Sequence, residues 1–235
     1  MTHFEIVVKH SDSTLRFVPA VLFLALGMAS AQAPSPESVM NRRVPRALDA
    51  GDQSQLYAAH GVLLEAGLSG GVVDLGDVGP TADAAVPEGT TVSEALTQVL
   101  GGRTKYYWRE IGGGVDILPQ KGIPPLLVTN IPFYEWRSDE SPYSAVERLQ
   151  QLPEVTRRMS QLGYVDGLHH GPGLQKAPRV AASPEPLQPP RTYVRRNMAL
   201  LDLLNEIVKS YPPPAIWSYQ EVVQDQVRAV TISAR

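Results

Sequence analysis

The amino-acid sequence predicts an α+β protein made of two small units, each with short helices packed on a two- or three-stranded sheet. Two stretches carry this prediction, residues 91–119 and residues 197–234, because each has the pattern of a helix followed by a two-stranded hairpin. Helices and strands that alternate with short turns pack into layered folds of this class. The 21 prolines among 235 residues favour small folded units joined by extended segments.

The first stretch begins with a helix signal. Thr91 and Glu94 stand three residues apart, as the two side chains of a capping box do. Apolar residues follow at helical spacing as far as Leu100, and two glycines end the helix. Residues 104–110 are rich in aromatic side chains and predict a strand, which turns at three glycines and returns through residues 115–118.

The second stretch repeats this order less closely. Asn197 is the expected cap of a helix with a leucine-rich stripe, and three prolines end that helix because proline cannot continue one. Residues 216–222 are the expected aromatic strand, and residues 227–233 are the return strand. An internal duplication and a chance likeness both agree with this pattern.

Residues 1–31 have the pattern of a secretory signal peptide. Lys9 and Arg16 precede an apolar core at residues 17–29, and Ala29-Ser30-Ala31 is a small-residue cleavage site. A retained membrane anchor is the alternative, but the apolar core is much shorter than the ~20 residues that a spanning helix needs.

We therefore expect an exported chain that begins at Gln32 and resides in the periplasm or outside the cell, without a stable membrane anchor. Residues 32–52 are an expected linker, since they are rich in proline and polar side chains. The first unit is expected at residues 53–120. It begins with a helix at residues 53–67, whose inward side chains include Leu64, with His60 at the edge of the core.

The second unit is expected at residues 123–235. Residues 126–136 predict extended chain, either as one strand or as two strands broken at Pro132. Two helices are expected at residues 141–152 and 153–162. A surface insert rich in proline and glycine is expected at residues 166–190, and a short strand at residues 192–194.

Residues 56–118 resemble the short N-terminal domain of secretins and TonB-dependent receptors, the STN domain. The resemblance lies in the helix that ends in Glu65-Ala66-Gly67-Leu68, in the helix at residues 91–100, and in the two strands that follow it. Residues 191–233 look similar to the second half of this pattern. The resemblance implies a periplasmic interaction module without catalysis. The sequence shows no pore or barrel of the kind that follows this domain in the family, so no transport role is carried over.

The composition excludes several chemistries. The chain has no cysteine, which removes disulfides, thiol nucleophiles and cysteine-ligated metals. The formal net charge is −3 and no basic field is evident, so nucleic acid is not an expected partner. His169 and His170 are adjacent in a loop, where they lack the further ligands that a zinc site needs. We expect no cofactor and no metal.

Two patterns suggest catalysis and neither is convincing. Residues 67–71 match the nucleophile motif G-x-S-x-G, but a helix precedes the serine and a strand follows it, which reverses the order that the motif requires. Glu110 and Glu221 occupy matched places in the two stretches and could form a carboxylate pair. Solvated carboxylates at strand ends are the simpler interpretation, so no catalytic residue is expected.

These observations predict a non-enzymatic, exported protein-interaction module of the bacterial cell envelope. Its partner would be another envelope protein, bound through the edge of a hairpin, because edge strands are templates for another chain. The alternatives are an envelope hydrolase and a protein that binds a small ligand or a glycan. The side chains expected at the interaction surface are Tyr106, Trp108, Trp217, Tyr219 and Val230.

Overall fold

The computed structural model describes residues 38–49, 54–76, 85–101, 105–166, 189–224 and 227–235, which belong to one compact unit. The expected signal peptide at residues 1–31, most of the insert at residues 166–190, and His169 and His170 lie outside the described residues. Within the described ranges, every helix is too short or too polar to cross a membrane.

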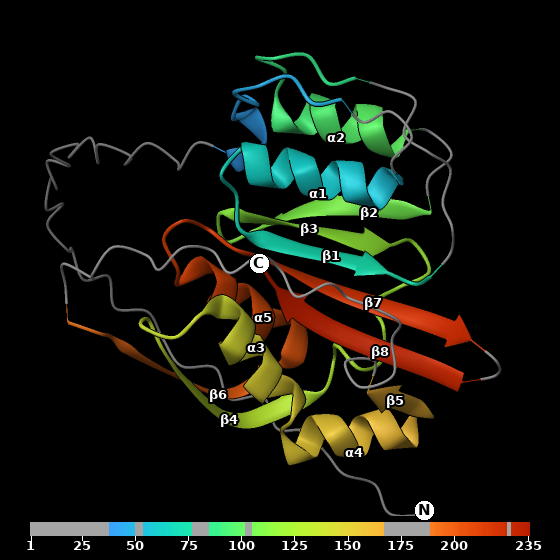
Figure 1. Ribbon diagram of the computed structural model, residues 1–235, viewed down its shortest axis with the longest axis vertical. Helices are drawn as coiled ribbons and strands as arrows, with labels where there is room; N and C mark the ends of the chain where they lie inside the picture. Colours follow the sequence, from blue (N-terminus) through green and yellow to red (C-terminus); the bar gives the residue numbers. More distant parts are fainter. Residues whose placement is uncertain (1–37, 50–53, 77–84, 102–104, 167–188, 225–226) are drawn as a thin grey trace, which may run out of the picture. The chain divides into compact units, whose positions relative to one another are not determined.

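Six strands form the main sheet (Figure 1). Their order is β2 (Tyr106–Ile111), β3 (Gly114–Pro119), β1 (Gly70–Asp74), β7 (Ile216–Gln224), β8 (Val227–Ala234) and β5 (Tyr164–Asp166). The antiparallel hairpins β2–β3 and β7–β8 flank β1, which runs parallel to both of its neighbours. The short strand β5 lies parallel to β8 at the far end.

The α+β class expected from the sequence is confirmed, but the main sheet is larger than expected. The sheets of two or three strands that we expected are joined, because β1 from the first half pairs with β7 from the second. This pairing runs from Gly70↔Ile216 to Asp74↔Gln220. A buried strand must satisfy its backbone groups on both sides, and β1 does so only between the two hairpins.

Two helices cover one face of the main sheet over β1, β2 and β3. They are α1 (Gln55–Glu65) and α2 (Val92–Leu100), and the short 3-10 helix η1 (Val39–Asn41) lies beside α2. The expected capping box of α2 is present, with the Thr91 and Glu94 side chains each bonded to the other's backbone. On α1, Leu63 is buried but Leu64 is 47% exposed, so the expectation that Leu64 faces inward is wrong.

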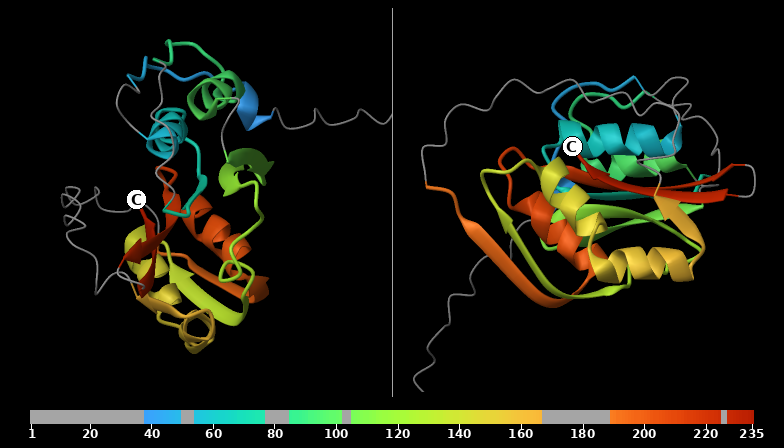
Figure 2. Two further views of the ribbon diagram at one scale, coloured as in Figure 1. Left: turned by 90° about the vertical axis from the view of Figure 1, so that its right-hand side faces the viewer. Right: turned by 60° about the horizontal axis from the view of Figure 1, so that its bottom comes forward.

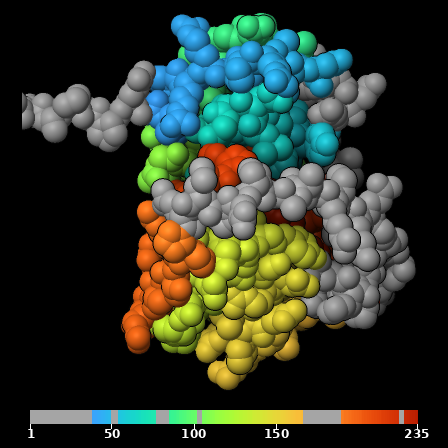
Figure 3. Space-filling view, turned by 60° about the vertical axis from the view of Figure 1, so that its left-hand side comes forward, coloured from blue at the N-terminus to red at the C-terminus, as the bar shows by residue number. Residues whose placement is uncertain are grey.

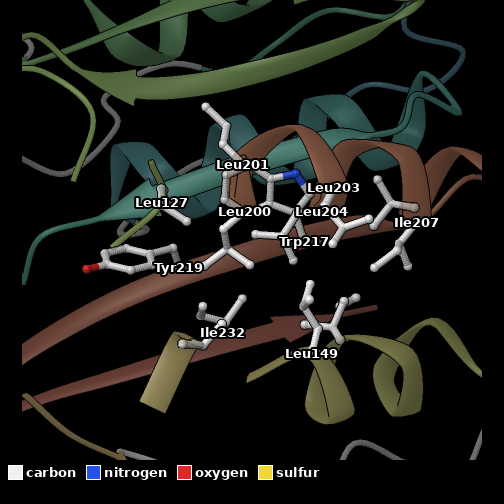
Figure 4. Packing of buried hydrophobic residues seen from close by; sticks show 14 of the residues in the cluster. Leu127, Leu149, Leu200, Leu201, Leu203, Leu204, Ile207, Trp217, Tyr219 and Ile232 are labelled. Carbon is white, nitrogen blue, oxygen red and sulfur yellow. The ribbon is translucent and has the colours of Figure 1, made fainter. Parts of the chain in front are cut away.

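The other face carries the larger core. Here α5 (Leu200–Lys209) lies on β1 and β7, and α3 (Pro142–Gln150) lies on β8, with α4 (Pro153–Gln161) beside β5. Figure 4 shows the α5 leucines above Trp217 and Tyr219 of β7, with Ile232 and Leu149 on the opposite side. The leucine-rich stripe expected for this helix is confirmed, since its members are buried.

A separate two-stranded ribbon pairs β4 (Asn130–Arg137) with β6 (Thr192–Ala199), and both strands contact α5 (Figure 2). β4 is one strand, and its register with β6 skips Pro132, which has no N–H to donate. Asn197 is not a helix cap: it lies in β6 with a φ of 50°, and Ala199 is the cap of α5, without a side-chain hydrogen bond. Asparagine tolerates this left-handed conformation better than most residues.

Candidate functional site

The five side chains expected at an interaction surface are mostly internal. Tyr106, Trp217, Tyr219 and Val230 are buried, and Trp108 is partly buried against the core under α1 and α2. Val230 does not lie on an edge, because β8 is paired with β7 on one side and with β5 on the other. The expectation that Tyr106, Trp217, Tyr219 and Val230 form an exposed surface is therefore wrong. Sequence reasoning treated the second hairpin as isolated, whereas the tertiary structure places it inside the main sheet.

β2 forms one end of the main sheet, and no other strand among the described residues pairs with its outer side. Figure 1 labels β2 next to β3 at this end of the main sheet. Its register with β3 is regular from Tyr106↔Pro119 to Ile111↔Gly114. An edge of this kind carries backbone donors and acceptors that can bond another strand.

The pairing pattern shows which residues of β2 direct their backbone groups outward. Gln120 donates its N–H to the Lys105 carbonyl at 2.7 Å, so this pair is hydrogen-bonded. Bonded and non-bonded pairs alternate in an antiparallel ladder. Tyr106, Trp108 and Glu110 therefore turn their N–H and C=O groups away from β3. The proline opposite Tyr106 agrees with this assignment, because it has no N–H to contribute.

Neither charged side chain of β2 protects the edge. Arg109 lies against Asp116 of β3, with its Nη2 3.3 Å from Oδ2 of the aspartate. Glu110 accepts hydrogen bonds from the Ser38 hydroxyl at 2.5 Å and from the Val39 N–H at 3.2 Å. Proteins usually guard exposed edges with free charges, prolines or bulges, and the residues of β2 supply none of these.

The other strand edges are short or modified. β5 has only three residues, and its pairing with β8 ends at Val230. Further along β8, the N–H of Ile232 donates to the Gln150 side chain at 3.2 Å. β6, whose orange atoms lie at the margin in the space-filling view (Figure 3), carries Arg195 and Arg196 next to the left-handed Asn197. A bent backbone disfavours regular pairing. β2 is thus better suited than β5 or β6 to accept a strand.

A buried polar network lies directly behind this edge. Asp116 is fully buried, and its Oδ2 accepts hydrogen bonds from Nδ2 of Asn205 at 2.9 Å and from Arg109. Asn205, on α5, in turn accepts a hydrogen bond from the Trp217 indole at 2.7 Å. The network therefore connects β2 and β3 to α5 and β7.

The ion pair between Arg109 and Asp116 uses only one atom of each side chain. Oδ1 of Asp116 and Nε of Arg109 are both buried and have no hydrogen-bond partner within the described part of the chain. Burial raises the pKa of Asp116 above its ordinary value, although Asn205, Arg109 and Lys209 act in the opposite direction. The cost of removing water from the carboxylate thus outweighs the contribution of its partners.

Trp217 occupies its place because Gly71 lies opposite it in the β1–β7 register. A Cβ atom on Gly71 would lie 1.9 Å from the indole ring. The glycine therefore leaves the space in which the indole lies flat on β1 and reaches Asn205. The sequence contained this glycine, but no local pattern linked it to a tryptophan so distant in the chain.

A second polar cluster surrounds Glu221 on β7. Its Oε1 accepts hydrogen bonds from the hydroxyls of Tyr164 and Tyr219, each at 2.6 Å. Arg228 lies 3.6 Å from Oε2, donates to the Tyr164 hydroxyl at 3.0 Å and stacks over the Tyr164 ring. Burial, together with Glu221, raises the pKa of both tyrosines.

The expectation that Glu221 is a solvated carboxylate is wrong, since its side chain is 13% exposed and three donors surround it. Glu110 is exposed and binds η1, so the two glutamates share no partner and form no carboxylate pair. Ser69 is buried between α1 and β1, where a nucleophile would not be accessible. Within the ranges that the structure describes, no group of three or more potential metal ligands occurs.

Comparisons of this chain with protein-family models, with curated proteins and with solved structures found no match. The geometry of the described residues is therefore the basis for any functional proposal.

Proposed function

We propose that this chain is a non-enzymatic, exported interaction module of the bacterial cell envelope that binds an extended segment of another envelope protein along β2. The added segment would form a seventh strand of the main sheet. Backbone hydrogen bonds would supply the affinity, and alternate side chains on the two faces would supply the selectivity.

The observation that carries the proposal is the outer edge of β2, with which no other strand among the described residues pairs. Trp108 and Glu110 direct backbone groups outward, and both charges of the strand are engaged with internal partners. Tyr107 is 37% exposed on the face toward α5, where it offers an aromatic contact to an incoming strand. The resemblance to the STN domain supports the same class of function and the same compartment.

A hydrolase is a weaker proposal for the described residues. Glu221 is the best candidate for an acid or base, but its carboxylate already receives two tyrosine hydroxyls and faces Arg228. A catalytic carboxylate must reach a substrate proton at hydrogen-bond distance. The arrangement around Glu221 instead ties β5 to β7 and β8, which is a structural role.

The test compares two substitutions at one position of the edge. Trp108→Pro removes the outward N–H and the indole but keeps the β2–β3 ladder, because that N–H does not point toward β3. Trp108→Ala removes the indole and keeps the N–H. We expect the wild type to capture a specific protein from envelope extract, the alanine variant to capture less of it, and the proline variant to capture none.

Capture that is equal for the wild type and for a folded Trp108→Pro variant would refute strand addition at β2. A peptide from the captured protein should then be tested with the purified chain, since β-augmentation predicts binding of an isolated extended segment. The compartment has a separate test: N-terminal sequencing of the exported chain should begin at Gln32.

A further inference from the structure

The outer face of α1 lacks the polar side chains that a helix on a protein surface normally carries. The exposed residues of this helix are Tyr57 and Leu64, whose exposed fractions are 61% and 47%. Gly61 lies between them, one helical turn from each. Surface helices normally present charged or polar residues to water, and a helix that is apolar all round is normally buried.

The other helices of the described chain show what the solvent face of α1 lacks. α2 exposes Glu94, Thr97 and Gln98, and α5 exposes Asp202. The inner face of α1 already packs on α2, β1 and β7 (Figure 1), so the apolar outer face is additional to what the core requires. This contrast indicates that another apolar surface covers the outer face of α1.

The face is complementary to a second copy of itself. A Cβ atom on Gly61 would meet nothing within 4 Å, so another helix can approach the backbone at this point. Helices whose contact residues are small approach to ~8 Å, the short end of the usual range. If two antiparallel copies of α1 cross beside Gly61, Tyr57 of each copy lies beside Leu64 of the other. Two equivalent aromatic–aliphatic contacts then flank the close approach.

Electrostatics favour the antiparallel arrangement over the parallel one. Glu65 is the only acidic residue of α1 and ends the helix. Antiparallel pairing places this carboxylate near the N-terminus of the other α1, which is the positive end of the helix dipole. Parallel pairing would bring the two Glu65 carboxylates together. The residues of the contact itself are uncharged, so the two copies meet without repulsion.

The undescribed segments nearest to α1 in sequence offer little matching surface. Residues 50–53 and 77–84 together contain one large aliphatic side chain, Val78, among glycine, alanine, proline and polar residues. A second copy of α1 instead supplies an apolar face of the same size and shape. Self-complementarity therefore identifies the occupant.

We propose that α1 is a dimerisation surface, which pairs antiparallel with α1 of a second copy of this chain about a two-fold axis beside Gly61. An isologous contact of this kind closes as a dimer and does not continue into a fibre. The inference goes beyond the proposed function and does not depend on it, because strand addition would use β2 and dimerisation uses α1.

The contact is limited to one helix of 11 residues, so the dimer should be weak. Stable interfaces bury ~1,200–2,000 Å² in total, and two short helices crossing at a glycine bury less. We expect a dissociation constant near ~100 µM, so that sedimentation equilibrium shows monomer near ~5 µM and mostly dimer near ~500 µM.

Two substitutions with opposite charge test the register. Tyr57→Glu and Leu64→Lys each place a charge in the apolar contact, so each variant alone should raise the dissociation constant by at least ~10-fold. An equimolar mixture should form a mixed dimer with roughly wild-type affinity. In that dimer one carboxylate lies beside one ammonium, and the other Tyr57–Leu64 contact is intact. Parallel pairing would not bring the two new charges together.

Both substitutions are at exposed positions and place charges that suit the helix dipole, so the chain should remain folded, which circular dichroism checks. Thr97→Lys on α2 is the matched control, because it adds a charge at an exposed helix position away from the contact. This variant should dimerise as the wild type does.

A wild type that is monomeric at ~500 µM would overturn the inference, since that concentration exceeds the expected dissociation constant several-fold. A mixture of the two charged variants that stays monomeric would also overturn it, as would association that is lost in folded Trp108→Pro. The proposed function is judged separately. Partner capture that survives Tyr57→Glu and fails in Trp108→Pro supports strand addition at β2, whatever the result for α1.

Discussion

At the scale of single residues, Asp116 is the most unusual group in the described structure. A buried carboxylate is costly unless its partners compensate fully, and here Oδ1 of Asp116 and Nε of Arg109 are left without partners in the described ranges. The folded protein consequently binds a proton at Asp116 more tightly than the unfolded chain does. Ionisation of Asp116 therefore lowers the free energy of unfolding, whereas ionisation of an aspartate in a well-formed salt bridge raises it.

The pH dependence of unfolding tests this point. Because the pKa of Asp116 is raised on folding, its contribution to stability is most favourable below the ordinary aspartate pKa. That contribution is lost as the pH rises through the higher, folded-state pKa. Asp116→Asn cannot ionise, so the variant should gain stability relative to the wild type as the pH rises. Urea titrations from about pH 4 to about pH 7 measure the difference. Parallel pH profiles for the two proteins would contradict the assignment.

Gly71 is a second critical position. Its replacement by alanine would place a Cβ atom 1.9 Å from the Trp217 indole, so the ring would have to move and its hydrogen bond to Asn205 would be lost. We expect Gly71→Ala to destabilise the protein by about 3 kcal/mol or more, above the usual range for overpacking.

Gly61 supplies the matched control for Gly71. It lies within α1, and a Cβ atom there would meet nothing within 4 Å. Gly61→Ala should therefore stabilise the protein by about 0.5–1 kcal/mol, because alanine favours the helix. Chemical denaturation of both variants decides the matter, and similar effects of the two substitutions would refute this account of Gly71.

At the scale of elements, α2 and α5 each depend on one apolar stripe. Leu96 and Leu204 are both fully buried in the middle of these stripes, on opposite faces of the main sheet. We expect Leu96→Asp and Leu204→Asp each to abolish folding, since an unpaired buried charge costs several kcal/mol out of a typical stability of ~5–15 kcal/mol. Circular dichroism of the purified variants measures the loss.

Thr97 provides the control on the same helix, because it is exposed on α2 one residue beyond Leu96. Thr97→Asp introduces the same charge without burial, so it should cost only a few tenths of a kcal/mol. A folded Leu96→Asp variant, or a Thr97→Asp variant that is equally unfolded, would show that the stripe has been placed on the wrong face.

At the scale of the whole molecule, the main sheet makes the two halves interdependent. β1 pairs with β3 and with β7, and Asp116 of the first half bonds Asn205 of the second. Contacts of this extent across a shared sheet favour a single cooperative transition. We therefore expect one calorimetric unfolding transition whose calorimetric and van't Hoff enthalpies agree. Two separate transitions, or a Leu204→Asp variant that keeps α1 and α2 folded, would show that the halves fold independently.

The sequence by itself determined the local elements. The capping box at Thr91, the leucine-rich stripe of α5 and the two hairpins were all predictable, because each depends on residues that are neighbours in the chain. The same local logic failed at Asn197 and Leu64. Both positions satisfy a helical pattern, but contacts with β4 and the packing of α1 decided their conformation or exposure.

Only the tertiary structure decided which strands are neighbours, and therefore which strands lie at the ends of the main sheet. Nothing local marks β1 as the partner of β7, since parallel pairing joins segments far apart in the chain and is selected by burial on both faces. The same pairing buries Trp217, Tyr219 and Val230, and leaves β2 at one end of the main sheet. The candidate site thus follows from long-range burial and hydrogen bonding, which a one-dimensional pattern does not encode.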